Sequence, residues 1–427
     1  MSKAKLLLLI IITGLIALGV YLRSDEELSP AAVQWLEKLE FSKQDFNTDN
    51  AYIYLMGQVA SPHDSVYGVG LERIKQSERA YKDGEFENHD FHLSDYKDTN
   101  PALNPNNTLI CTGEDSRLCL VKYINTPDNA RKTVEIYSDV LRRYKTMMAA
   151  PNYRTLNTIH ILGRLPEYQY IMIGSRLALL EAIAQTNHSP QLALTLLQED
   201  IINLRKQLAL ADTLIHKMVI NRALSRAIDS LSLLFTNNVI PPSLVTPLVT
   251  NKLTPAELSM IKAMQGELAF SINTNIGSMA LDKYNNDFTQ WMLKFIYLPN
   301  ATANLLQNFY EEVSNLSQSA PNQYLSKRNL ALAENPGLHI KNIAGRVLLG
   351  IGHIDFREYT DRLFNLNNKL KLIRVRWANT ADIDLSAPEN SSPLDQSPPY
   401  YHSDEDGKPL ICYKSLSDRL SDHCLMI

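Results

Sequence analysis

One polar stretch of the chain holds the densest group of side chains able to bind a metal: Glu85, Glu87, His89, Asp90, His92 and Asp95. Neutral imidazoles and carboxylates are both ligands of zinc and other transition metals, and His89, Asp90 and His92 are the strongest candidates. Their spacing nevertheless matches no established metal-binding motif. We therefore interpret the stretch as a solvated loop and expect neither a metal nor a cofactor.

A serine and a lysine three residues apart, Ser259 and Lys262, reproduce the SxxK nucleophile pattern of penicillin-binding proteins. Those enzymes also need a KTG element and a β-sheet, and the chain has no KTG tripeptide. The pattern is therefore interpreted as a chance match on an amphipathic helix. The HExxH, GxSxG and P-loop patterns are absent as well.

Three histidines, His160, His216 and His353, lie in or beside apolar stretches. A general base needs a partner that orients it, and no carboxylate partner is identifiable for any of them. They are expected to be structural. No catalytic residue can be assigned on these grounds, and the sequence favours a protein that is not an enzyme.

The four cysteines form two close pairs along the chain. Cys111 and Cys119 are separated by seven residues, and Cys412 and Cys424 by eleven. An even number of cysteines in an exported protein indicates disulfides, and the spacings are too wide for zinc knuckles. Three pairings are open, as is a state with free thiols; the two local pairs are favoured.

An uncharged run from Leu6 to Leu22 follows Lys3 and Lys5 and ends at Arg23. As a helix it would be ~25 Å long, slightly short of a bilayer's hydrocarbon core. It is either a retained anchor or a signal peptide cleaved near the small-x-small sequence of residues 17–19. The length of the run favours the anchor.

The charges that flank this run predict its orientation. Lysines precede it, while Asp25, Glu26 and Glu27 follow Arg23. Positive charge stays on the cytoplasmic side, so the amino end is expected there. The sequence therefore predicts a single-pass inner-membrane protein whose bulk lies in the periplasm.

Composition favours a helical globular domain. The chain is 45% hydrophobic and 21% charged, which excludes disorder and a multi-span membrane protein, and its 16 glycines in 427 residues disfavour a turn-rich β-protein. A net charge of −4 gives no reason to expect a nucleic-acid partner. The apolar periodicity predicts helices over residues 30–39, 52–58, 64–80, 126–148, 166–185, 190–208, about 212–235, 254–279, 300–316, 340–350 and 359–375.

The remaining segments lack this periodicity. Residues 81–122 are expected to form an ordered loop held by the first cysteine pair, since so long an unstructured loop is unusual. Residues 387–399 are rich in proline and serine and indicate an arm. Tyr400–Ser403 and Leu410–Tyr413 flank an Asp406-Gly407 turn and predict a hairpin.

These predictions give a mainly α fold, an irregular helical bundle or short solenoid. It is divided into an anchor at residues 1–23, a periplasmic helical domain at 28–385 that includes the loop 81–122, and an arm with a disulfide-closed hairpin at 386–427.

Three short segments carry a family resemblance. They are residues 49–57 (Asp-Asn-Ala-Tyr…Leu…Gly), the Asn335-Pro336-Gly337 turn before the last helices, and the closing residues 406–413 (Asp-Gly-Lys-Pro-Leu…Tyr). They resemble segments of exported, membrane-anchored helical proteins of Gram-negative bacteria, which close with such a hairpin. The resemblance covers about a tenth of the chain and implies no activity and no functional residue.

The favoured function is therefore a tethered helical scaffold that binds another envelope protein or a peptide, because helical bundles offer grooves for such partners. One alternative is an enzyme acting on peptidoglycan or lipid, with a site that the sequence does not reveal. Another is a carrier that holds a small ligand in a pocket between helices.

Overall fold

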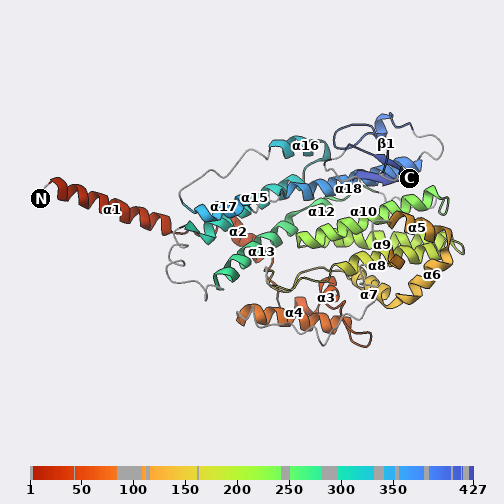
Figure 1. Ribbon diagram of the computed structural model, residues 1–427, viewed down its shortest axis with the longest axis horizontal. Helices are drawn as coiled ribbons and strands as arrows, with labels where there is room; N and C mark the ends of the chain where they lie inside the picture. The colour runs from red at the N-terminus through yellow and green to blue at the C-terminus, as the bar shows by residue number, and fades with distance from the viewer. Residues whose placement is uncertain are drawn as a thin grey trace.

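A computed structural model shows a mainly helical protein with a small sheet at its carboxyl end (Figure 1). It describes residues 3–42, 44–83, 108–111, 116–160, 163–241, 251–280, 296–330, 341–351, 355–378, 384–404, 407–414, 416 and 423–427. His353 and the candidate metal ligands His89, Asp90 and His92 lie outside these residues, as do residues 335–337 of the family resemblance.

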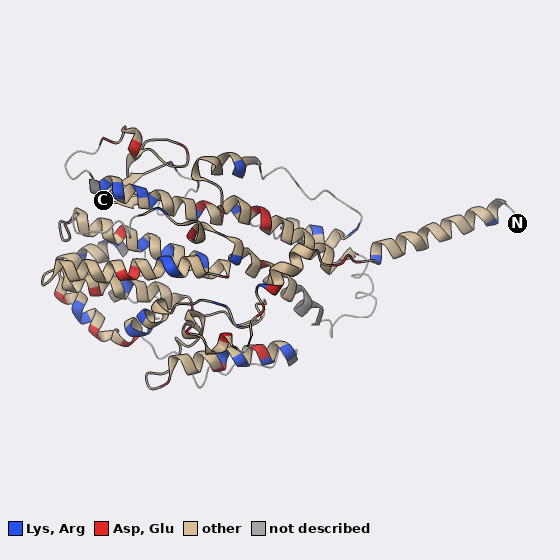
Figure 2. Ribbon diagram, turned by 180° about the vertical axis from the view of Figure 1, so that it is seen from behind, with Lys and Arg blue, Asp and Glu red and all other residues tan. Residues whose placement is uncertain are grey.

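The first helix, α1 (Lys3–Arg23), projects from one end of the molecule (Figure 1). Its 21 residues give a length of ~31 Å, about the thickness of a bilayer's hydrocarbon core. Residues Ala4–Arg23 are long and apolar enough to cross a membrane, and none of this span is buried. Figure 2 shows Lys and Arg only at the two ends of α1.

Five helices that pack against one another form the middle of the domain, and short turns join α8 to α9 and α9 to α10. Helix α8 (Gln169–Gln185) is buried along most of its length, because it contacts α6, α7, α9 and α10. It therefore has no polar face. Ser189 caps the next helix and Pro190 occupies its first turn, as the sequence predicts. The helices of this layer are α6 (Pro127–Ile136), α7 (Ser138–Ala149), α8 (Gln169–Gln185), α9 (Pro190–Leu210) and α10 (Leu214–Thr236).

Elements that precede α6 in the chain pack against this layer. Asn50 caps α3 by accepting a hydrogen bond from the Tyr52 amide at 3.0 Å. Helix α3 packs between α4 and α7, while α5 contacts α6, α8 and α10. The bounds are η1 (Asp45–Asn47), α3 (Ala51–Met56), α4 (Val66–Asp83), η3 (Thr108–Ile110) and α5 (Ser116–Asn125).

The other helices lie along α10 and toward the side from which α1 projects (Figure 1). Helix α15 contacts α2, α13, α16, α17 and α18, and α18 in turn packs on α10. The bounds are α2 (Pro30–Glu37), α12 (Pro255–Leu258), α13 (Ile261–Ala280), α15 (Pro299–Ser317), α16 (Pro321–Leu330), α17 (Ile343–Ile351), α18 (Arg357–Ala378) and η6 (Pro388–Asn390).

The carboxyl end forms an antiparallel sheet in the order β1 (Tyr400–Ser403), β2 (Pro409–Cys412) and β3 (Cys424–Met426). Tyr401 pairs with Ile411, as expected for the predicted hairpin. The third strand was not predicted; it pairs with β2 and packs on α10 and α18. The hairpin therefore docks on the helices both through β3 and through β2, which also contacts α18.

Two predicted helices are each broken in the structure. The helix expected from residue 126 to 148 breaks at Tyr137, a buried residue that ends α6 and precedes α7. The helix expected over 254–279 breaks at Ser259 and Met260, because the Met260 side chain is fully buried and its amide donates to Ser317 Oγ at 2.9 Å. Burial of one residue outweighs continuous helical periodicity in both places.

Two helices were missed. Helix α5 lies inside the stretch expected to lack helices, and α16 has too polar a sequence to show an apolar stripe. Tyr324 packs α16 against the rest of the domain. Its side chain is fully buried, and its ring stacks on Phe364 with the centroids 4.0 Å apart.

Candidate functional site

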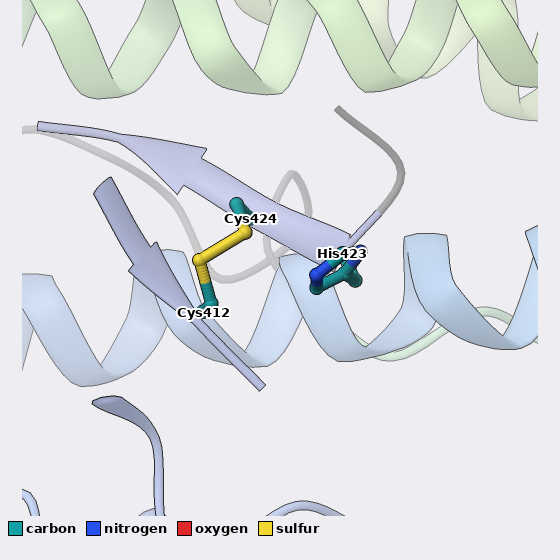
Figure 3. A group of neighbouring side chains, drawn as sticks. All are labelled: Cys412, His423 and Cys424. Atoms are coloured by element: carbon teal, nitrogen blue, oxygen red, sulfur yellow. A yellow bond between two sulfur atoms is a disulfide. The ribbon is translucent and has the colours of Figure 1, made fainter. Parts of the chain in front are cut away.

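The described residues include one cluster of potential metal ligands, at the carboxyl-terminal sheet. Cys412, Cys424 and His423 are buried, with ligand atoms within 4.8 Å of one another. The two sulfur atoms are bonded to each other, however, and Figure 3 shows His423 beside this disulfide. A metal binds thiolates, so the cluster is a disulfide that fastens β2 to β3 and is not a metal site.

Both local cysteine pairs favoured from the sequence are bonded in the structure. Cys111 joins Cys119 with Cα atoms 5.5 Å apart, and Cys412 joins Cys424 with Cα atoms 4.1 Å apart. These disulfides suggest that the chain folds in an oxidising compartment.

The two described histidines of the sequence analysis lie in the core. His160 is 5% exposed and burial lowers its pKa. The His216 ring stacks on Tyr153 with centroids 3.7 Å apart, and burial lowers its pKa to about 3. Neither His216 nitrogen has a hydrogen-bond partner among the described residues. A neutral ring packed in this way suits a structural role.

The described residues enclose a cleft of about 820 Å³. Its three walls are the end of α2 with the loop after it, the irregular segment 152–159 between α7 and α8, and one face of α13. Leu210 and Asp212, at the junction of α9 and α10, complete the lining. This volume lies within the range of ~300–1,000 Å³ that is typical of small-ligand sites.

Hydrogen bonds to surrounding elements fix the segment 152–159. The Asn50 side chain accepts from the Arg154 amide at 3.0 Å and donates to its carbonyl at 2.9 Å. Tyr52 donates to the Asn157 side chain, and Asn273 of α13 donates to the Ile159 carbonyl at 3.1 Å. The segment therefore forms a rigid wall although it has no regular secondary structure.

Arg154 connects this wall to the one formed by α2. Its guanidinium donates to the carbonyl oxygens of Lys38 and Glu40 and lies 3.9 Å from an Asp45 carboxylate oxygen. These contacts use much of its donor capacity within the protein. Arg154 is therefore a structural tie between two walls of the cleft.

Asp212 is buried at the cleft wall, between the last turn of α9 and the Thr213 cap of α10. Its carboxylate accepts from the Thr155 amide at 2.7 Å and from Thr155 Oγ1 at 2.8 Å. Burial raises its pKa, while the Thr155 hydrogen bonds and the nearby Lys262 ammonium oppose the shift. Its first role is thus to hold the segment 152–159 against α9 and α10.

Helix α13 lies unusually close to this junction, because Gly266 has no side chain. A Cβ atom at Gly266 would lie 2.3 Å from the Asp212 carbonyl oxygen. The close approach brings one face of α13 to the cleft, and that face carries Lys262, Gln265, Ala269, Ile272 and Asn273. These positions recur at helical spacing.

The structure places the two residues of the SxxK pattern in different surroundings. Lys262 lines the cleft and Ser259 does not. Ser259 ends α12, and its hydroxyl accepts from the Ile261 amide at 3.3 Å. The two residues therefore form no nucleophile and base facing the cleft, and Lys262 alone belongs to the candidate site.

Sequence reasoning missed the rest of this site. Asp212 and Thr213 do show one signal, a polar pair between two leucine-rich helices with a threonine suited to capping. No comparable signal marks Gln265 or residues 152–159, whose neighbours are distant along the chain.

No protein family matches the chain, and neither a curated protein nor a solved structure is significantly similar to it.

Proposed function

We propose that this protein is a membrane-tethered binding protein whose ligand occupies the cleft between α2, α13 and the segment 152–159. The observation that carries the proposal is the cleft itself, about 820 Å³ in volume with walls fixed by hydrogen bonds. A preformed hollow of this size favours a bound molecule over a purely structural role.

The proposed location is the inner membrane, crossed once by α1, with the rest of the chain in the periplasm. Lysines at the start of α1, acids after it and two disulfides support this orientation. Tethering would hold the cleft near the membrane and near other envelope components.

Native mass spectrometry of the full-length protein released from its own membrane tests the proposal. The wild type should carry an added mass, and filling the cleft with Ala269→Trp should remove it. Gln191→Trp, at an exposed position of α9 outside the cleft, is the matched control and should keep the mass.

Leu39→Glu, on the opposite wall and half-buried, covers the case in which Ala269→Trp fails to fold. A wild type without added mass, or one whose added mass survives both cleft variants, would contradict a ligand in this cleft.

A cell-envelope enzyme is the second candidate, and Asp212 is the observation that favours it. A buried carboxyl with a raised pKa at the wall of a cleft is the kind of group that catalytic sites use. An enzyme should convert the bound molecule during incubation, and Asp212→Asn should stop the conversion. Recovery of the molecule unchanged would leave binding as the function.

A further inference from the structure

Side-chain character changes along the wall of the cleft that α13 forms. Lys262 and Gln265 lie near the amino end of the helix, and Ala269 and Ile272 follow one and two turns later. From Lys262 to Asn273 the helix advances by ~16 Å. The cleft is therefore elongated, with a cation and an amide at one end of this wall and apolar side chains farther along it.

The opposite wall mixes apolar and polar side chains, because Lys38, Glu40, Asp45 and Thr48 line it beside three apolar residues. Leu36, Leu39 and Phe41 line it, and all three are only half-buried. Ile159 of the fixed segment adds another half-buried apolar side chain. A ligand that covered these groups would remove apolar surface from water, at ~25 cal/mol for each Å².

Two donors of residues that line the cleft have no partner among the described residues. The Lys262 ammonium is exposed and makes no hydrogen bond or ion pair with the described residues. Gln265 is only 4% exposed, and its Nε2 has no partner among the described residues. A buried amide without a partner is costly, so this end of the cleft favours a ligand with acceptor oxygens.

Two other polar groups of the cleft are held by contacts within the protein. Thr155 donates twice to Asp212, and Arg154 is held by carbonyl oxygens and Asp45. A negatively charged oxygen beside Lys262 would therefore leave the contacts of Thr155 and Arg154 intact. Charge-assisted hydrogen bonds of this kind are about twice as strong as neutral ones.

The cleft also lies toward the membrane-spanning helix. In Figures 1 and 2, α13 runs from the middle of the domain toward the side from which α1 projects. Helix α2, whose end forms the opposite wall, begins at Pro30, seven residues after α1 ends at Arg23. A molecule leaving the bilayer surface would have a short path to the cleft.

Resting on the proposed binding function, we propose that the ligand is a single-chain amphiphile from the membrane. Its acyl chain lies between Leu36, Phe41 and Ile272, and its anionic head contacts Lys262 and Gln265. The head is a carboxylate or a phosphate, as in a fatty acid or a lysophospholipid.

Photo-crosslinking of the full-length protein in nanodiscs of phosphatidylcholine tests this inference. The probes are palmitic acid and lysophosphatidylglycerol with a diazirine in the chain, and the fatty alcohol of the same chain length. Digestion and mass spectrometry locate the label. Both acidic probes, or the one with the native head group, should label peptides containing residues 36–41 and 269–273, and the alcohol should label them about tenfold less.

Lys262→Glu should reduce this cleft labelling by about tenfold, as expected for the loss of a charge-assisted hydrogen bond. Lys75→Glu, an exposed lysine of α4 outside the cleft, is the matched control and should label like the wild type. Melting curves show whether each variant is folded, and Gln265→Leu gives a second way to weaken the head-group contact.

Label confined to α1, or cleft label that is equal for the acidic probes and the alcohol, would overturn the amphiphile. The binding function would survive that result if native mass spectrometry still found a cleft-dependent mass of another kind. The two proposals can therefore fail separately.

Discussion

Asp200 is a buried carboxyl whose pKa should be visible in the stability of the protein. The Tyr144 hydroxyl donates to it at 2.7 Å and Ser175 Oγ lies 3.5 Å away, yet burial raises its pKa from 3.8 to about 7. Between these values the folded state binds the proton that the unfolded state has released. The free energy of unfolding should therefore fall as the pH rises from about 4 to 7.

Asp200→Asn should remove this dependence, because the amide keeps an acceptor for Tyr144 and does not titrate. From pH 5 to pH 8 the variant should gain roughly 2–3 kcal/mol of stability relative to the wild type, measured by denaturant unfolding. Asp128→Asn, at an exposed position of α6, should show no such change. Parallel pH profiles for the wild type and the Asp200 variant would show that Asp200 is not protonated in the folded state.

Gly266 should tolerate no side chain, because helix α13 approaches the Asp212 carbonyl oxygen there. Gly266→Ala should destabilise the protein by about 1–3 kcal/mol in spite of alanine's better helix propensity. Gly68→Ala in α4 is the control. Its Cβ would meet Ser65 at an ordinary 3.4 Å, so the protein should become slightly more stable. Equal effects at the two glycines would argue against the close approach of α13.

Single residues of the site were the least predictable from sequence. Lys262 was singled out for its spacing to Ser259, but its place in the cleft depends on Gly266 meeting Asp212. Gln265 carries no local signal, since its significance comes from burial without a partner. Contacts such as Thr155 with Asp212 join positions 57 residues apart, and no local pattern encodes them.

The helices, by contrast, follow from their local signals. Ser189-Pro190 and Thr254-Pro255 begin helices where the capping preferences place them, and Thr254 forms a full capping box with Glu257. Breaks such as Met260 were missed because burial in the tertiary structure decides them. Strand β3 was missed because three residues show no alternation of their own.

The carboxyl-terminal sheet should stabilise the domain, because its inner side chains are buried. Ile411, Tyr413 and Leu425 are fully buried, and the Tyr413 hydroxyl donates to the Asn390 carbonyl at 2.5 Å. Deleting residues from Tyr400 onward should lower the melting temperature by several degrees, since ~1 kcal/mol shifts a domain of about 150–250 residues by about 2–4 °C.

Replacing Cys412 and Cys424 together with alanine should lower the melting temperature less than the deletion does, because the strands remain and only the crosslink of a short loop is lost. Amide exchange gives a second measurement, in which Leu410 to Cys412 should be protected. Unchanged melting after the deletion, or fast exchange along β2, would mean that the sheet is not docked on α10 and α18.

At the scale of the whole molecule, α1 is joined firmly to the domain. The Asp25 carboxylate accepts from the Asn300 and Ala301 amides at the start of α15, at 2.9 and 3.1 Å. Asn304 donates to the Glu27 carbonyl at 3.0 Å and accepts from the Ser29 amide at 2.7 Å. A carboxylate at a helix amino end is favourable, so these contacts restrict rotation of the domain relative to α1.

The contacts between the residues after α1 and helix α15 lead to a specific prediction for the membrane topology of the chain. Lys3 and Lys5 in the first turn of α1 should hold the amino end in the cytoplasm, while the acids after Arg23 become contacts of the exported domain. A carboxyl-terminal alkaline phosphatase fusion should therefore be active, and a reporter that matures only in the cytoplasm should stay dark. Carbonate washing should leave the full-length protein in the membrane.

Release of a shorter chain by carbonate would instead indicate cleavage of a signal peptide near residues 17–19. The domain would then keep Asp25 and its contacts with α15 but lose its tether. The opposite reporter pattern would contradict export altogether. It would also place Cys111, Cys119, Cys412 and Cys424 in a reducing compartment, where disulfides rarely persist. An exported domain should therefore contain both disulfides, and a cytoplasmic one should not. Mass spectrometry of a non-reduced digest from the same cells measures the disulfides independently of the reporter fusions.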